Sequence, residues 1–161
     1  LMADYGRQIL PEATWRTTNY ESGGDLVGHD LVLLGYSLGE NSERLDANLD
    51  RAWAAAEKVL IVVEPGTPAG WAVIARTRAR LLAAGAHLLA PCPSSASCPM
   101  TKGDWCHFST RLRRTSLHRK LKGGELGYED EKFSYLVASR ESVPVSAGRI
   151  LRHPLIAPGR V

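Results

Sequence analysis

Three cysteines lie close together in a chain that has no others: Cys92, Cys98 and Cys106. Grouped thiols of a reducing compartment are more often metal or iron–sulfur ligands than disulfides. Their spacing is not the paired C-x-x-C of zinc ribbons. Three thiolates leave one position for His107, as in a Cys₃His zinc site, or for a cysteine outside the chain, as in a four-thiolate cluster. The alternative is that the three are small buried hydrophobic residues.

A dense basic run follows the cysteines. From Lys102 to Lys122 there are seven Lys or Arg against one acid, although the whole chain has a net charge of only +3. Closely spaced cations suit phosphate contacts, so the run predicts a polyanion partner, most simply RNA. The residues expected to contact it are Arg111, Arg113, Arg114, Arg119, Lys120 and Lys122. The alternatives are a solvated helix face and partial pairing with the acids at 125–131.

The elements that must position these residues alternate between strand and helix. Strands are expected over 29–36, 58–64, 86–91 and 133–140, a short one over 13–20, and helices over 45–56 and from Pro68 up to Gly85. Thr67 is expected to cap the second helix and Ser42 the first. This alternation predicts a parallel α/β sheet with right-handed crossovers. Residues 108–121 are expected to form a helix with a break near Thr115–Ser116.

Two loops follow the first two buried strands, where open α/β sheets bind ligands. One holds Tyr36, Ser37 and Glu40, and the other holds Glu64 and Thr67. A tight turn before a capped helix explains both loops equally well. No Ser–His–Asp order, phosphate-binding glycine loop or acid/base pair is visible in the sequence, so no catalytic residue is assigned.

The bulk composition is that of an ordinary globular domain. The chain has 161 residues, of which 44% are hydrophobic and 23% charged. Its longest apolar run is far too short to span a bilayer, so no membrane partner is expected. The first residue is Leu1, and the chain reads as a fragment cut at both ends.

Several segments together resemble one known family. They are "DLVLLGYSLGE", "VEPGTPAG", "APCPSSASCPM", "DWCHFSTRLRRTSLHRKLKGGELGYEDEKFSY" and "RILRHP". They are similar to the methyltransferase-like protein associated with the small ribosomal subunit of mitochondria, and to its bacterial relatives. The resemblance implies the C-terminal part of a Rossmann-like class I methyltransferase sheet with helices on both faces. Residues 1–161 would form one partial domain without its first strands, and 91–124 a cysteine-rich and basic insertion.

The resemblance also implies cofactors and partners. Cys92, Cys98 and Cys106 match the first three ligands of a 4Fe–4S cluster, whose fourth cysteine would fall past Val161. Tyr36 and Ser37 would lie near the methyl donor, S-adenosylmethionine, or near the acceptor. The implied partner is small-subunit ribosomal RNA and not DNA, in the mitochondrial matrix or the bacterial cytoplasm. The implied role is RNA binding in subunit assembly or translation; an active rRNA methyltransferase and a zinc-stabilised structural module are the alternatives.

Overall fold

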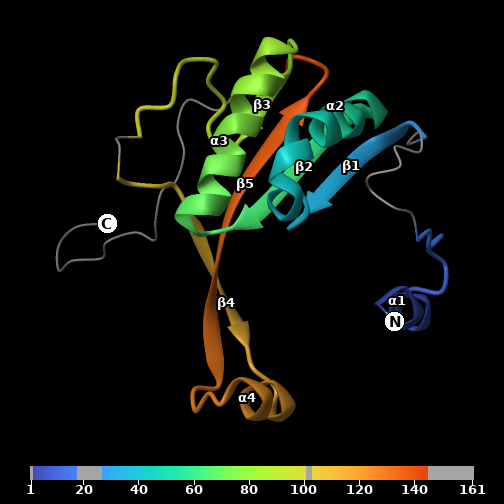
Figure 1. Ribbon diagram of the computed structural model, residues 1–161, viewed down its shortest axis with the longest axis vertical. Helices are drawn as coiled ribbons and strands as arrows, with labels where there is room; N and C mark the ends of the chain where they lie inside the picture. The colour runs from blue at the N-terminus through green and yellow to red at the C-terminus, as the bar shows by residue number, and fades with distance from the viewer. Residues whose placement is uncertain (1, 18–26, 101–102, 145–161) are drawn as a thin grey trace.

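A mixed sheet of five strands organises the chain (Figure 1). The computed structural model describes residues 2–17, 27–100 and 103–144. The strands are β1 (His29–Gly35), β2 (Ala56–Pro65), β3 (His87–Ala90), β4 (Phe108–Arg113) and β5 (Tyr128–Ser139). β1 and β2 are parallel, and β5 runs antiparallel between β2 and β3. The predicted parallel pair is therefore confirmed, and the last strand reverses direction in the middle of the sheet.

The helices are α1 (Met2–Ile9), η1 (Gly39–Arg44), α2 (Leu45–Ala55), α3 (Pro68–Ala83) and α4 (Ser116–Lys122). η1 and α2 connect β1 to β2, α3 connects β2 to β3, and α4 lies between β4 and β5. α3 begins as predicted, because the Thr67 hydroxyl accepts a hydrogen bond of 3.1 Å from the Gly70 amide. Gly85, at φ +78°, ends the turn that follows it. The predicted Ser42 cap is wrong, because Ser42 lies within the 3₁₀ helix η1 and α2 begins only at Leu45.

The core lies between one face of the sheet and the helices α2 and α3. Its members are Leu45, Leu49, Ala52 and Trp53 of α2, Ile74 and Leu81 of α3, and Leu60, Val62, Leu136 and Ala138 of the sheet. Both helices pack on this same face. The opposite face carries Leu31 and Leu33, which are 54% and 61% exposed. The helices expected on both faces are thus seen on one face only in the described residues.

The segment 108–121 differs from the helix expected of it. Residues 108–113 form β4, which pairs antiparallel with β5 from Phe108 beside Phe133 to Arg113 beside Tyr128. The expected break at Thr115–Ser116 is present, since α4 begins at Ser116 and the Thr115 hydroxyl accepts from the His118 amide at 3.1 Å. The long-range pairing with β5 overrides the local helical signal.

Two further expectations fall near the start of the chain. Residues 13–17 form no strand, and 18–20 lie outside the described residues. Among the helices that the structure describes, none has the length and apolar character needed to cross a bilayer.

β4 and the first half of β5 leave the sheet as a two-stranded ribbon with α4 at its end (Figure 1). We call residues 108–133 the arm. β5 continues from the arm into the sheet, where its second half pairs with β2. One strand therefore belongs to both parts of the molecule.

Candidate functional site

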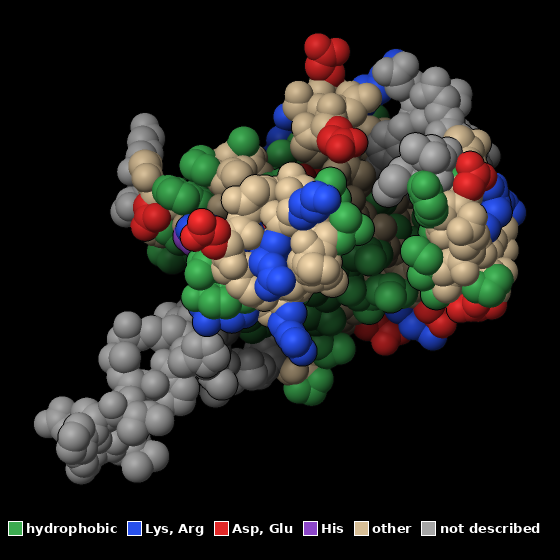
Figure 2. All heavy atoms as spheres, turned by 90° about the horizontal axis from the view of Figure 1, so that it is seen from below, with side chains coloured by type: hydrophobic (Ala, Val, Ile, Leu, Met, Phe, Trp, Pro, Cys, Tyr) green, Lys and Arg blue, Asp and Glu red, His purple; other side chains and the backbone are tan. Residues whose placement is uncertain are grey.

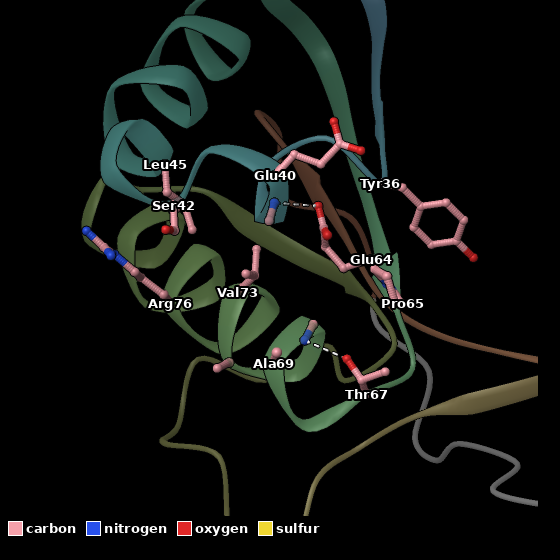
Figure 3. A pocket seen from close by; sticks show the side chains of 13 residues that line it. Tyr36, Glu40, Ser42, Leu45, Glu64, Pro65, Thr67, Ala69, Val73 and Arg76 are labelled. Atoms are coloured by element: carbon pink, nitrogen blue, oxygen red, sulfur yellow. Dashed lines mark hydrogen bonds between the residues drawn. The ribbon is translucent and has the colours of Figure 1, made fainter.

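A cavity of about 750 Å³ lies at the carboxyl ends of β1 and β2 (Figure 3). It is bounded by η1, the start of α2 and the first turns of α3. Its polar lining residues are Tyr36, Glu40, Ser42, Glu64, Thr67 and Arg76. The two loops singled out in the sequence therefore do meet, at the end of the sheet where small ligands bind in α/β folds.

Glu64 is the buried polar group of this cavity. Its side chain is 1% exposed, and its Oε1 accepts hydrogen bonds from the amides of Leu38 at 3.0 Å and Gly39 at 3.3 Å. The carboxylate at the end of β2 thus holds the turn that follows β1. Burial raises the pKa of the Glu64 carboxyl above its usual value, although the amides that it accepts from act in the opposite direction.

Tyr36 and Ser37 occupy the same turn. Tyr36 has φ +52°, and its amide donates to the Val63 carbonyl at 2.8 Å, which ties the turn to β2. Its ring points away from the other lining side chains and is half exposed (Figure 3). The Ser37 hydroxyl is buried with no hydrogen-bond partner in the part of the chain that the structure describes. Ser37 follows Tyr36 directly in the chain, but it is not among the residues that line the cavity.

The loop between β3 and β4, residues 91–107, carries the three cysteines. Its two ends are fixed on one edge of β5, where Ala90 pairs with Val137 and Phe108 with Phe133. The other edge of β5 pairs with β2. Four residues of strand separate the two attachment points, which is about 13 Å. The base of the loop is therefore closed, and Cys92 and Cys106 lie near it.

Contacts with the body fasten this loop along its length. The Arg78 guanidinium of α3 donates to the carbonyls of Ser94 and Ala96, both at 2.6 Å. The Trp105 indole N–H donates to the Gly66 carbonyl at 3.1 Å, beside the start of α3. The hydroxyl of the buried Ser134 donates to the Cys106 carbonyl at 2.8 Å. The loop is held by α3 on one side and by β5 on the other.

The thiols themselves do not form a ready-made metal cage. Cys92 and Cys98 are exposed, Cys106 is half-buried, and no disulfide joins them. Within the described ranges, no group of three or more His, Cys, Asp or Glu side chains is placed to hold a metal ion. Thiolate sulfur is nevertheless a donor that suits iron or zinc. His107, the alternative ligand, stacks against Trp105 with ring centroids 5.5 Å apart.

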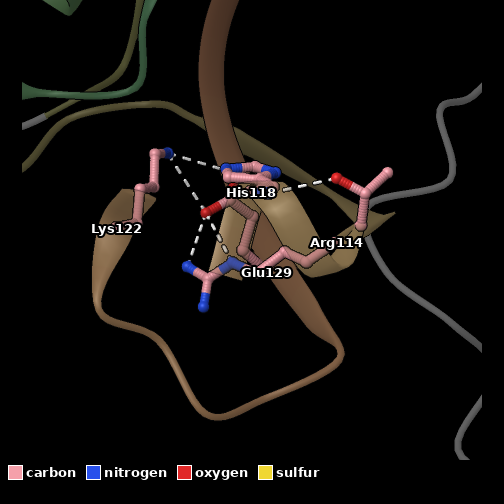
Figure 4. A network of polar contacts seen from close by, with 5 residues as sticks. Arg114, His118, Lys122 and Glu129 are labelled. Atoms are coloured by element: carbon pink, nitrogen blue, oxygen red, sulfur yellow. Dashed lines mark hydrogen bonds and ion pairs between the residues drawn. The ribbon is translucent and has the colours of Figure 1, made fainter. Parts of the chain in front are cut away.

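The predicted RNA contacts all lie on the arm, but they fall into two groups. The first group surrounds Glu129 (Figure 4). This carboxylate pairs with Arg114 at 2.6 Å, Lys122 at 3.2 Å and the His118 ring at 3.3 Å. The hydrogen bonds from Arg114 and, to a smaller extent, from Lys122 lower the pKa of Glu129 to about 2. The network ties α4 to β5 and so fixes the end of the arm.

Arg111 is also a paired cation, because it bridges to Asp130 at 2.8 Å and lies over the Tyr128 ring at 4.0 Å. The second group consists of the remaining three cations, of which Arg113 and Lys120 are exposed and Arg119 is partly exposed. Arg113, Arg119 and Lys120 have no ion pair within the described part of the chain. Three of the six predicted cations are therefore available to a partner, and three stabilise the arm.

The sequence pattern of the family described as mitochondrial small ribosomal subunit Rsm22 matches residues 3–161. The chain belongs to the Rsm22 family. A comparison with curated proteins found no match. The description of this family names the mitochondrial small ribosomal subunit.

Sequence reasoning found the cavity loops, the cysteine loop and the basic arm of this Rsm22 family member, but it missed three residues that organise them. Glu64 was noted only as a loop residue, although it directly follows the apolar run 59–63 within β2, where a carboxylate needs hydrogen-bond partners. Arg78 carried no local signal, because its partners are carbonyls 16 and 18 residues away. Glu129 was grouped with its acidic neighbours, although it alone holds three basic side chains.

Proposed function

We propose that this chain is the methyltransferase-like part of a small-ribosomal-subunit-associated protein and that its arm binds ribosomal RNA. The observation that carries the proposal is the arm, which presents cations at a distance from the body in a member of the Rsm22 family. Phosphate contacts need cations free of protein carboxylates. Arg113, Arg119 and Lys120 meet this condition. The compartment is that of the ribosome it serves, the mitochondrial matrix or the bacterial cytoplasm.

The paired cations have a different part in this proposal. Arg111, Arg114 and Lys122 hold the ribbon and α4 in one conformation through Asp130 and Glu129. A preorganised arm loses less conformational freedom on binding than a flexible basic loop would. The predicted contact set is therefore narrowed to the three unpaired cations.

The test is RNA affinity as a function of salt. Removing two phosphate contacts with Arg113→Ala/Lys120→Ala should lower affinity for small-subunit rRNA and reduce the slope of log K against log salt by about 1 to 2. The matched control is Arg7→Ala/Arg16→Ala, which removes the same charge from exposed positions outside the arm. An unchanged slope in the arm variant, or an equal change in the control, would exclude the arm as the phosphate-binding element.

The order of the sheet supports a methyltransferase-like fold. β1, β2 and β3 point the same way, and the final strand β5 is reversed and inserted between β2 and β3. A reversed last strand in this place is typical of class I methyltransferases, whereas a dinucleotide-binding sheet is mostly parallel. The cavity at the ends of β1 and β2, which Tyr36 lines, favours a ligand near Tyr36 and Ser37.

The second candidate function is an active S-adenosylmethionine-dependent rRNA methyltransferase. The same cavity favours it, because it lies where this fold places the reacting groups. Calorimetric titration of the full-length protein with S-adenosylmethionine, followed by transfer of labelled methyl groups to small-subunit rRNA, separates the two candidates. RNA binding without cofactor binding would leave a scaffold that keeps the fold but not the chemistry.

We also propose that the loop 91–107 binds a 4Fe–4S cluster through Cys92, Cys98 and Cys106, with the fourth ligand outside the chain. The closed base of the loop supports this, because it keeps the cysteines in one region. The cluster would supply a rigid cross-link between the loop and the body. Anaerobic reconstitution of the full-length protein should give broad absorption at about 400 nm. A colourless protein that takes up zinc would favour the structural-module alternative instead.

A further inference from the structure

The end of the arm carries exposed leucines that an RNA contact does not use. Leu117 and Leu121 are 64% and 78% exposed, and Leu126, in the segment that returns to β5, is 59% exposed. Leu117 and Leu121 are four residues apart on α4 and so share one face of the helix. An apolar helix face at a projecting end of a molecule is typical of an interaction surface.

This end of the arm is built to hold one shape. Thr115 caps the start of α4, and Gly123 ends it in the left-handed conformation at φ +62°. Arg114 lies just before α4 and Lys122 is its last residue, so their ion pairs with Glu129 hold both ends of the helix against β5. The leucines are therefore presented on a fixed surface, which lowers the entropy cost of docking.

Cations surround these leucines. Arg119 and Lys120 lie on α4 between Leu117 and Leu121 in sequence, and neither has an ion pair in the described residues. Figure 2, which looks onto the end of the arm, shows Lys and Arg side chains beside hydrophobic ones. The complementary surface combines apolar side chains with carboxylates.

We propose that the end of the arm, residues 115–126, docks onto an acidic, apolar surface of a protein in the small ribosomal subunit. The proposal rests on the proposed function, since it takes the small subunit as the partner assembly. Bases in single-stranded RNA stack on aromatic rings, and residues 112–127 contain no Phe, Tyr or Trp. Interfacial membrane helices bury a longer apolar face than a helix of seven residues offers.

The test compares three purified probes with the full chain: intact small subunits, naked small-subunit rRNA and anionic phospholipid vesicles. Leu117→Ser/Leu121→Ser removes the apolar face at positions that are already exposed, and its fold is checked by thermal melting. The matched control is Ile9→Ser/Leu10→Ser on and beside α1, where the side chains are 75% and 47% exposed. We expect the arm variant to lose affinity for subunits by about ten-fold or more. Its affinity for naked rRNA should stay unchanged, and the control should behave like the wild type.

A second measurement identifies the surface directly. A benzophenone side chain introduced at Leu121 should crosslink the chain to its partner on intact subunits. The crosslinked product should be digested by protease and should resist nuclease. A nuclease-sensitive product, an equal loss of rRNA affinity in the leucine variant, or vesicle binding that the leucine variant loses would each overturn the proposal. So would subunit affinity that the leucine variant leaves unchanged.

A comparison of an Arg113 variant with the leucine variant separates protein docking from the proposed RNA contact. Arg113→Ala alone is used for this comparison, because Lys120 lies within residues 115–126 and Arg113 does not. If Arg113→Ala weakens subunit binding and the leucine variant does not, RNA binding stands and protein docking falls. If the leucine variant weakens subunit binding and the wild type does not bind naked rRNA, docking stands and the RNA contact falls. A wild-type chain that does not bind purified subunits overturns both.

Discussion

Replacing Glu64 tests whether a buried carboxylate organises the cavity at the ends of β1 and β2. Its Oε1 accepts from two amides of the turn after β1, and the side chain is 1% exposed. In Glu64→Ala both amides lose their acceptor, and an unsatisfied buried N–H costs about 1–3 kcal/mol. Because the neighbouring cavity admits some water, we expect a total loss of about 2–4 kcal/mol in the free energy of unfolding. For a domain of this size that lowers Tm by roughly 5–15 °C.

The isosteric variant Glu64→Gln separates the charge from the hydrogen bonds, because its amide oxygen accepts from the same two N–H groups. Burial raises the pKa of Glu64 in the folded chain, so the folded chain holds its proton more tightly than the unfolded chain does. Wild-type stability is therefore full below the unfolded pKa and is partly lost as pH rises through the higher, folded pKa. Glutamine does not titrate, so the stability of Glu64→Gln relative to wild type should increase from pH 4 upward.

Urea unfolding measured across this pH range checks both statements. Glu40→Ala is the control, because Glu40 lines the same cavity as an exposed carboxylate and should change stability by less than about 0.5 kcal/mol. The reasoning fails if Glu64→Ala unfolds at the same urea concentration as wild type. It also fails if wild type and Glu64→Gln follow parallel curves against pH.

Three further outcomes follow from the loop and the arm. Arg78→Ala releases two carbonyls of the cysteine loop, so Cys92 and Cys98 should react faster with a thiol reagent while stability changes by about 1 kcal/mol or less; equal rates would contradict the clamp. Gly123→Ala places a Cβ at φ +62° and should weaken α4 by about 1 kcal/mol, measured as faster amide hydrogen exchange in this helix alone. Glu129 has its pKa lowered from 4.5 to about 2, so its contribution to the arm is present above pH 4.5 and is lost as pH falls toward 2. The protection of the α4 amides, taken as the ratio of the intrinsic to the observed exchange rate at each pH, should therefore fall on acidification in wild type but not in Glu129→Gln.

The strands β1 and β2 and the helix α3 could be predicted, because the sequence features that define them are local. The apolar stretches of β1 and β2 read as buried strands, and Thr67 with Gly85 marks the limits of α3 and its turn. β4 was not predictable in this way, since its stability comes from pairing with a strand 15 to 25 residues further along. The sequence alone therefore favoured a helix that the tertiary pairing excludes.

The same strand explains why the six cations predicted to contact RNA divide into a paired and an unpaired group. Arg113 and Arg114 are neighbours, and at the end of a strand neighbouring side chains point to opposite sides. Arg114 accordingly reaches Glu129, while Arg113 stays open to solvent. A helical reading of this segment cannot separate them. The direction of each thiol was also beyond prediction, because a loop without regular structure gives no pattern for side-chain direction.

β5 joins the arm to the sheet as one continuous strand. The strand runs unbroken from Tyr128 in the arm to Ser139 beside β2 and β3. At the point where it enters the sheet, the Lys132 carbonyl accepts from Gly66 and the Ser134 hydroxyl donates to Cys106. A displacement of α4 that bent β5 would therefore reach Gly66, next to the cavity-lining residues Pro65 and Thr67, and Cys106 at the end of the cysteine loop. The consequence is that the tip of the arm, the cavity and the cysteine loop share one strand of twelve residues.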